Sequence, residues 1–204
     1  MSHLEIRRAR APADWQAVRA LRYEGLAARA EVPPCDARSF ADEFDEAPNT
    51  TTYLLAAGAR AVGTTRTSVR AAGRHAALPS ERVFATEIAT AFGAQASIVE
   101  ASLTFIDPCA AAAQDALTRL FKVHVMHCGL ADADALVVAV RETQMGFYRR
   151  MFGMEILSGA EPYPGMRMPR VLMGIAFREQ APVLLRRIPA LAASADDEAR
   201  FARL

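Results

Sequence analysis

The chain has few cysteines and no long apolar run, and both absences exclude whole classes of protein. Its 204 residues include three cysteines, an odd number without the paired spacing of a zinc site or a disulfide framework. No segment approaches the roughly 20 apolar residues of a membrane span, and the first residues lack the apolar core of a signal peptide. We therefore predict a cytoplasmic protein with no integral membrane segment and no bound metal.

A strong charge of either sign is also missing. The formal net charge at pH 7 is +1, which gives no overall bias towards nucleic acid or anionic lipid. Hydrophobic residues make up 52% of the sequence, as in ordinary globular proteins, and a chain of this length can bury a substantial core. We therefore predict no nucleic-acid partner, and the sequence leaves the oligomeric state open.

The most informative stretch runs from Ser97 to Phe121 and reads as a strand, a turn and a helix. Alternation divides the strand into an apolar face (Val99, Ala101, Leu103, Phe105) and a face with a carboxylate and two hydroxyls (Ile98, Glu100, Ser102, Thr104, Ile106). A strand inside an α/β domain is normally covered on both faces, so the polar stripe predicts a substrate cleft. A half-solvated strand is the alternative interpretation.

The remaining pattern predicts a mixed α/β domain. It indicates a hairpin around Gly58, buried strands at Leu136 to Val140 and Val171 to Phe177, and helices from Asp14, from Glu81, after Pro108 as far as Gly129, and before Gly153. This order predicts a mixed α+β sheet with helices on both faces. We expect one domain over residues 1–178, with residues 179–204 as a C-terminal appendage that is helical or partly disordered.

Glu100 is the first candidate for chemistry. A carboxylate on a central strand among apolar residues has a raised proton affinity, which suits a general base acting on an amine. An ion pair with Arg66 is the structural alternative. Tyr148 is a candidate proton donor to a leaving thiolate, although core packing is the commoner fate of such a tyrosine.

Other polar groups leave two interpretations open. Asp42 and Asp45 bind a cationic substrate group or form a solvated acidic loop. The turn after Asp107 leads to a helix N-terminus that favours anions, but it has alanines where a phosphate-binding loop has glycines. His124 and His127 lack the partners of a metal site. Four arginines form either a basic dock for an acidic carrier protein or solvated helix faces: Arg149, Arg150, Arg186 and Arg187.

Several segments together resemble a known superfamily. The strand that ends at Asp107-Pro108, the alanine-rich turn, the following helix, LVVAV and FYRRMFGM resemble the Gcn5-related N-acetyltransferases (GNAT) over roughly residues 50 to 177. More narrowly, LRYEGL, DEFD, TTYLLAAGARAVGTTRTS, LPSERVF and the strand with Glu100 resemble the FeeM-type N-acyl amino acid synthases, which are related to the LuxI-type acyl-homoserine-lactone synthases. The lactone synthases carry an arginine where this chain has Leu103, and aromatic residues where it has Leu26 and Val32, so the resemblance favours the FeeM group.

The resemblance implies a GNAT-like fold with a mostly antiparallel central sheet, and an N-acyltransferase without a bound cofactor. The implied donor is an acyl carrier protein thioester, or acyl-CoA, and the implied acceptor is the amine of an amino acid. The resemblance places Arg22, Asp42, Asp45, Arg66 and Glu100 where those families have polar site residues. For this activity we expect Glu100 and Tyr148 to act in catalysis; Arg22, Asp42, Asp45, Arg66, Ser102 and Thr104 to bind the acceptor; and Phe105, Ile106, Asp107, Cys109, Ala110 and Ala111 to bind the thioester. An acyl-CoA-dependent enzyme and a non-catalytic module that binds acyl groups or carrier protein are the competing hypotheses.

Overall fold

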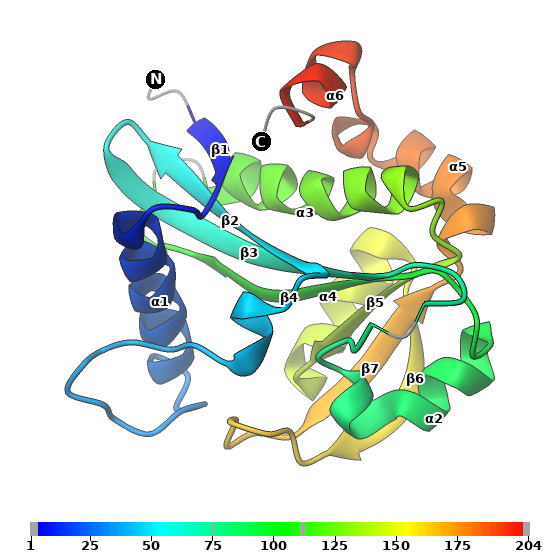
Figure 1. Ribbon diagram of the computed structural model, residues 1–204, viewed down its shortest axis with the longest axis horizontal. Coiled ribbons are helices and arrows are strands. Elements are labelled where there is room, and N and C mark those ends of the chain that lie inside the picture. The colour runs from blue at the N-terminus through cyan, green and yellow to red at the C-terminus, as the bar shows by residue number, and fades with distance from the viewer. Residues whose placement is uncertain (1–3, 75, 111–112, 202–204) are drawn as a thin grey trace.

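The computed structural model describes residues 4–74, 76–110 and 113–201. A seven-stranded sheet in the order β1-β2-β3-β4-β5-β7-β6 forms the centre of the molecule (Figure 1). Its strands are β1 (Leu4–Arg8), β2 (Thr50–Ala57), β3 (Arg60–Arg70), β4 (Ile98–Ile106), β5 (Ala135–Val140), β6 (Glu155–Glu161) and β7 (Arg170–Ile175). Only β4 and β5 pair in parallel; all other neighbours are antiparallel. The predicted mixed, mostly antiparallel sheet is confirmed.

Helices cover both faces of the sheet, as predicted (Figure 1). The α-helices are α1 (Pro12–Ala27), α2 (Glu81–Phe92), α3 (Ala113–Leu130), α4 (Glu142–Phe152), α5 (Phe177–Arg187) and α6 (Ala195–Phe201), with 3-10 turns at Glu43–Glu46 and Pro189–Leu191. α3, α4 and α5 pack against the larger core around Phe121 and Val138. α1 and α2 lie on the opposite face, where α2 buries Phe84 and Ile88. Among the residues that the structure describes, no helix is both long enough and apolar enough to cross a bilayer.

The two parallel strands separate before they end. β4 pairs with β5 only from Ile98 to Ala101, opposite Ala135 to Val138. Beyond these residues β4 continues to Ile106 and β5 to Val140 without pairing to each other. The sheet therefore opens between its two central strands, beside Ser102 and Ala139.

A β-bulge in β4 corrects part of the sequence prediction. Arg66 pairs with Ser102 and Thr64 pairs with Phe105, so β4 has one residue more than β3 in this interval. Leu103 absorbs the extra residue with a left-handed φ of 49°. The extra residue shifts the alternation by one position. Each side chain after the bulge therefore lies on the face opposite to the one that the sequence pattern predicts.

The exchange moves three predicted side chains. The Thr104 hydroxyl bonds the Thr65 hydroxyl at 2.6 Å, on the α3 face, and Ile106 packs beneath α3 with Leu120. Phe105 instead joins the cluster on the α1 side. The prediction that Thr104 and Ile106 share the face of Glu100, and that Phe105 opposes it, is therefore wrong.

Most predicted chain reversals are confirmed, with one exception. Gly58 and Gly153 turn the chain with φ values of 61° and 69°. Gly129, however, lies inside α3. The left-handed residue after this helix is Asp132, with φ 45°, a conformation that aspartate tolerates better than most side chains. The last helices pack on the rest of the molecule through Leu184, Leu191 and Phe201.

Candidate active site

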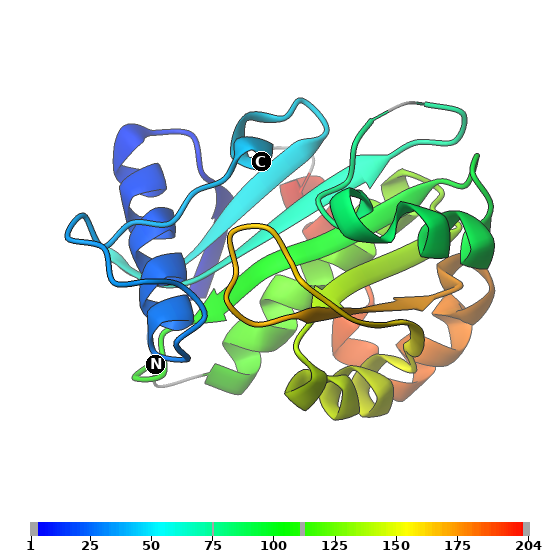
Figure 2. The ribbon, with the colours of Figure 1, turned by 90° about the horizontal axis from the view of Figure 1, so that it is seen from below.

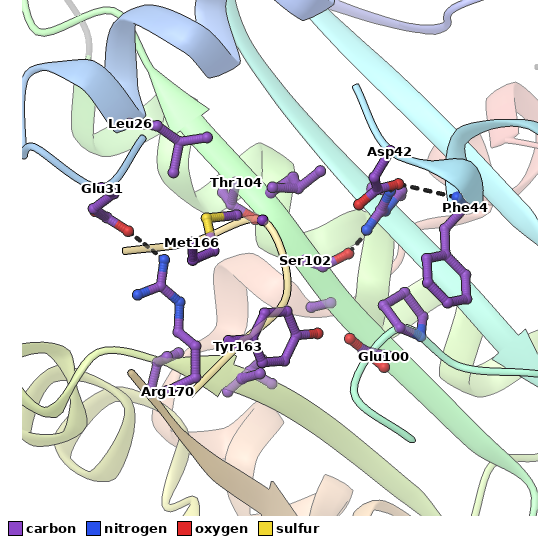
Figure 3. Close-up of a pocket in the computed structure, with 18 of the residues that line it drawn as sticks. Leu26, Glu31, Asp42, Phe44, Glu100, Ser102, Thr104, Tyr163, Met166 and Arg170 are labelled. Carbon is purple, nitrogen blue, oxygen red and sulfur yellow. Dashed lines mark hydrogen bonds and ion pairs between the residues drawn. The ribbon is translucent and has the colours of Figure 1, made fainter. Parts of the chain in front are cut away.

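A cavity of about 350 Å³ lies where β4 and β5 separate (Figure 3). Its floor is β4 from Glu100 to Phe105, and β5 contributes Val138 to Val140. The segment before β2, including Asp42 and Phe44, forms one wall. The loop between β6 and β7 (Figure 2) includes Tyr163 and Met166, which line the cavity (Figure 3). The cavity therefore combines segments from both halves of the chain.

Glu100 is completely buried on this floor and binds Ser80, not Arg66. Its Oε2 accepts hydrogen bonds from the Ser80 backbone N–H at 2.9 Å and from the Ser80 hydroxyl at 2.6 Å. Its Oε1 has no hydrogen-bond partner among the described residues. Burial raises the pKa of Glu100 to about 7, and the Ser80 hydrogen bonds oppose that rise. A carboxyl with this pKa exchanges protons near neutral pH.

Ser80 connects the start of α2 to the floor of the cavity. Ser80 precedes the first residue of α2, where a serine commonly caps the helix with its own side chain. Here the Ser80 side chain makes no capping hydrogen bond and bonds Glu100 instead. The start of α2 thus fixes the orientation of one Glu100 oxygen and leaves the other free.

Two arginines and two aspartates form a buried cluster beside Glu100. Asp45 accepts from Nη1 of Arg22 with both oxygens at 2.8 Å, and from Nη1 of Arg66 at 3.2 Å. Arg66 also pairs with Asp42 and donates from Nε to the Ser102 hydroxyl at 3.0 Å. Such charges can be buried because each is paired with an opposite charge through hydrogen bonds.

The cluster separates the predicted acceptor residues into two layers. Asp42, Arg66 and Ser102 line the cavity, whereas Arg22 and Asp45 lie behind them with side chains at most 2% exposed. The alternative interpretation of Glu100, an ion pair with Arg66, is not found, because the Arg66 guanidinium is directed to the two aspartates. Asp42 and Asp45 are not a solvated acidic loop.

The far end of the cavity is apolar. Leu26 of α1, Phe40, Phe105 and Met166 line this end and pack against one another. Gly25 permits this packing, since a Cβ at Gly25 would lie 2.2 Å from Cδ1 of Phe105. Thr104 also lines the cavity, but its hydroxyl is directed to Thr65 and away from a substrate.

Tyr148 lies on α4 and reaches the cavity from the side of β5. Its ring packs against Phe121 and Phe152, with centroids 6.0 and 5.9 Å away. Burial raises the pKa of Tyr148 to about 12, so the phenol remains protonated at neutral pH. Tyr148 therefore packs in the core, as one interpretation predicted, and also lines the cavity, as a catalytic role requires.

The predicted thioester residues after Phe105 are not among those that line the cavity. Asp107 pairs with Arg60, and its carboxylate accepts from the Cys109 N–H at 2.8 Å. The Ala110 N–H donates to the Asp107 carbonyl at 2.9 Å. These two amide groups therefore serve the turn itself. Ala111 lies outside the described residues.

Sequence reasoning missed the residues of the β6–β7 loop and the ion pairs beside it. Tyr163 faces Glu100, while Glu31 pairs with Arg141 at 3.2 Å and with Arg170 (Figure 3). Figure 3 shows Glu31 and Arg170 at the opposite side of the cavity from Phe44. The segment around Tyr163 has the proline and glycine content of any loop, and no pattern marks it as part of a site.

The two histidines of α3 make hydrogen bonds that hold this helix to the sheet. Both ring nitrogens of His124 are engaged, with the Thr65 hydroxyl at 2.9 Å and the Thr67 hydroxyl at 2.7 Å. His127 bonds the Tyr53 hydroxyl at 2.9 Å. Burial lowers the pKa of His124 to about 3, so the ring is neutral at physiological pH. His124 therefore joins α3 to β3 behind the cavity.

Comparisons with known proteins agree with this geometry. FeeM, an N-acyl amino acid synthase from uncultured soil microbes, superposes with a TM-score of 0.72 at 20% identity, covering 88% of this chain and 93% of FeeM. TofI, solved in a ternary complex with an inhibitor and MTA, gives 0.64 at 18% identity, covering 93% and 100%. BjaI, a CoA-dependent acyl-homoserine lactone synthase, gives 0.57 at 15% identity, covering 98% and 99%. At these identities the likeness establishes the fold.

The family assignment comes from sequence. A search among curated proteins gives no match. The model of the family described as N-acyl amino acid synthase FeeM matches residues 17–176, a range that includes every described residue of the cavity. Because the match spans most of the chain, this protein belongs to the FeeM family of N-acyl amino acid synthases and is an acyltransferase.

Proposed function

We propose that the protein transfers a medium or long fatty acyl group from an acyl carrier protein thioester to the amine of an amino acid. The observation that carries this proposal is the buried Glu100 carboxyl, whose Oε1 is unpartnered among the described residues at the point where β4 and β5 separate. Glu100 accepts a proton from the attacking amine, because its pKa of about 7 suits a general base near neutral pH.

The polar end of the cavity supports an amino-acid acceptor. Its wall carries the acids Asp42 and Glu43 together with the bases Arg66 and Arg82, and Asp42 pairs with Arg66 as Glu43 pairs with Arg82. Groups of both signs suit a zwitterion, whose ammonium and carboxylate need opposite partners. Ser102 lies between these groups and Glu100, where its hydroxyl is already oriented by Arg66.

The apolar end supports a fatty acyl chain. Leu26, Phe40, Phe105 and Met166 surround it, and burial of each methylene against such a surface contributes about 0.8 kcal/mol. In the proposed reaction the thioester carbonyl lies beside the bulge at Leu103, a residue that lines the cavity. Tyr148 protonates the departing thiolate, since its phenol remains protonated.

The preference for a carrier protein rests on surface charge near Tyr148. Arg149 and Arg150 lie exposed in the last turn of α4, and Arg186 and Arg187 in the last turn of α5. The Arg187 Nη2 donates to the Met151 carbonyl at 2.7 Å, which places the two pairs side by side. Such a basic patch favours an acidic carrier protein over a small donor.

The test supplies the enzyme with acyl chains of increasing length on carrier protein and on coenzyme A. Thiol release then identifies the donor, and mass spectrometry of the products from a panel of amino acids identifies the acyl chain and the acceptor. We expect amide product with the carrier protein thioesters, and a rise in KM for that donor alone when Arg149 and Arg150 are replaced by Glu. Equal use of acyl-CoA by the wild type and the variant would instead establish acyl-CoA as donor.

Lipids from a bacterial host that expresses the protein provide a second readout. A new N-acyl amino acid in the host is the expected result, and the matched control is a host that expresses Glu100→Gln. A host whose lipids do not change would count against the proposal when thiol release also fails in vitro. The proposed setting for this chemistry is the cytoplasm, where carrier protein thioesters are made.

A further inference from the structure

We propose that Tyr163 is an acceptor-binding residue of this site, whose hydroxyl holds the amine against the free oxygen of Glu100. The inference rests on the proposed function, because it requires an amine acceptor. It starts from two observations: the buried Oε1 of Glu100 has no partner among the described residues, and Tyr163, which lines the same cavity, points towards the Glu100 carboxylate (Figure 3).

The ring of Tyr163 is fixed from the side of α2. It stacks on Phe84, with ring centroids 6.4 Å apart and an interplanar angle of 30°. Phe84 itself is fully buried among Leu78 and Ile88, in the first turns of the helix that begins at Ser80. The same helix therefore orients Glu100 through Ser80 and supports Tyr163 through Phe84.

The loop that carries Tyr163 is also fixed at its other end. The Met166 N–H donates to the Tyr163 carbonyl at 3.0 Å, and the Arg167 N–H donates to the Glu31 carbonyl at 2.8 Å. The Glu31 carboxylate then pairs with Arg170 at the start of β7. A hydroxyl on a loop held at both ends is pre-organised, so little ordering is required when a substrate binds.

The protonation state of the Tyr163 phenol allows its hydroxyl to accept a hydrogen bond from an amine. Burial, together with the nearby Glu100 carboxylate, raises the pKa of Tyr163, so the phenol remains neutral in the working pH range. The neutral hydroxyl oxygen still accepts a hydrogen bond through its lone pairs. Glu100 Oε1 accepts as well, so these two residues that line the cavity contribute two acceptors to it.

The acceptor's ammonium first loses one proton to water, because only the neutral amine has a lone pair that can attack. Two acceptors match the two N–H groups of this neutral primary amine. One N–H donates to Glu100 Oε1 and the other donates to the Tyr163 oxygen, which leaves the nitrogen lone pair directed at the thioester carbon. Attack forms the N–C bond and the C–S bond breaks with its electrons on sulfur. The nitrogen gives its surplus proton to Glu100, and Tyr148 or water protonates the thiolate. No further reactant is needed.

The test compares Tyr163→Phe with wild type, using a primary amino acid and its N-methyl counterpart as acceptors. The variant keeps the ring on Phe84 and removes only the hydroxyl. We expect kcat/KM for the primary amine to fall at least about 10-fold, with an unchanged KM for the donor and an unchanged Tm. For the N-methyl acceptor, which has a single N–H, we expect wild type and variant to agree within about twofold.

The matched control is Tyr53→Phe, which loses a hydroxyl that bonds His127 at 2.9 Å on the α3 side of the sheet. It should lower Tm and leave acceptor kcat/KM unchanged. The slow hydrolysis of the thioester without an acceptor gives another readout, which Tyr163→Phe should not alter.

Unchanged kcat/KM for the primary amine in Tyr163→Phe would overturn the inference and leave the proposed function standing. A parallel loss of hydrolysis, Tm and both acceptors would overturn it too, since that pattern belongs to a structural residue. Wild-type enzyme that acylates no amine would overturn the proposed function, and this inference with it.

Discussion

Ser80 donates two hydrogen bonds to a single oxygen of Glu100. The backbone N–H lies 2.9 Å and the hydroxyl 2.6 Å from Oε2, and both residues are completely buried. The arrangement uses one carboxylate oxygen as an anchor and leaves Oε1 without a hydrogen-bond partner among the described residues. One residue at the start of α2 thus orients the candidate base and opposes the rise of its pKa that burial causes.

Replacement of Glu100 by Gln should reduce turnover strongly while the fold is retained. General base catalysis is worth roughly 10²- to 10⁴-fold, and the amide has the same shape without the proton affinity. In the wild type, kcat/KM should rise with pH through about 7, because the deprotonated carboxyl is the active form. Steady-state rates from pH 5 to 9 check both points. An undiminished rate at saturating amine would rule out Glu100 as the base.

The same substitution changes how stability depends on pH. The raised pKa of Glu100 means that the folded state binds this proton more tightly than the unfolded state, so its stabilising contribution is present below about pH 4.5 and is lost as pH rises to about 7. The free energy of unfolding of wild type should therefore fall relative to Glu100→Gln over that range, by on the order of 3 kcal/mol. Urea unfolding at a series of pH values measures the difference, and parallel curves would contradict the shift.

Replacement of Ser80 by Ala should move the acid limb of the pH profile to higher pH. The Ser80 hydroxyl hydrogen bond lowers the pKa of Glu100, so its loss leaves burial less opposed. The backbone N–H remains as a partner, which keeps the carboxyl in place. The pH dependence of kcat/KM in Ser80→Ala tests this direction, and an acid limb that moves to lower pH would show that the assignment is mistaken.

Asp45 and Asp42 should differ in their contribution to stability. Loss of Asp45 leaves the fully buried Arg22 without its ion-pair partner, at a cost of about 3–5 kcal/mol. Asp42, with a side chain 24% exposed, is the matched comparison, because Arg66 keeps Asp45 when Asp42 is removed. Urea unfolding of Asp45→Ala and Asp42→Ala should show the larger loss for Asp45. Equal losses would mean that the cluster is less buried than its geometry indicates.

Thr104→Val should affect stability and leave acceptor binding intact. The Thr104 hydroxyl bonds Thr65 on the α3 face, so its removal costs about 1 kcal/mol without altering the polar wall of the cavity. The KM for the acceptor should stay within about threefold of wild type. A large rise in that KM would return Thr104 to the substrate-binding role that strand alternation assigned to it.

Much of the fold follows from local pattern. The hairpin at Gly58, the helix after Ser80, the apolar run of β5 and the helix closed by Gly153 are each fixed by neighbours in sequence, through periodicity and turn residues. The same local information placed a carboxylate on the central strand at Glu100. Because alternation sets side-chain direction, the residue order alone puts Glu100 and Ser102 on one face of that strand.

What the sequence could not decide are the relationships between distant segments. A single inserted residue at Leu103 turned Thr104 and Ile106 to the opposite face, and nothing in the local pattern marks a bulge. The partners of Glu100 and Arg66 depended on where α2 and the segment before β2 come to lie. Sequence by itself therefore determined the elements and the presence of a buried acid. Tertiary packing alone decided which oxygen of that acid is free and brought Tyr163 opposite it, since both depend on contacts between residues far apart in the chain.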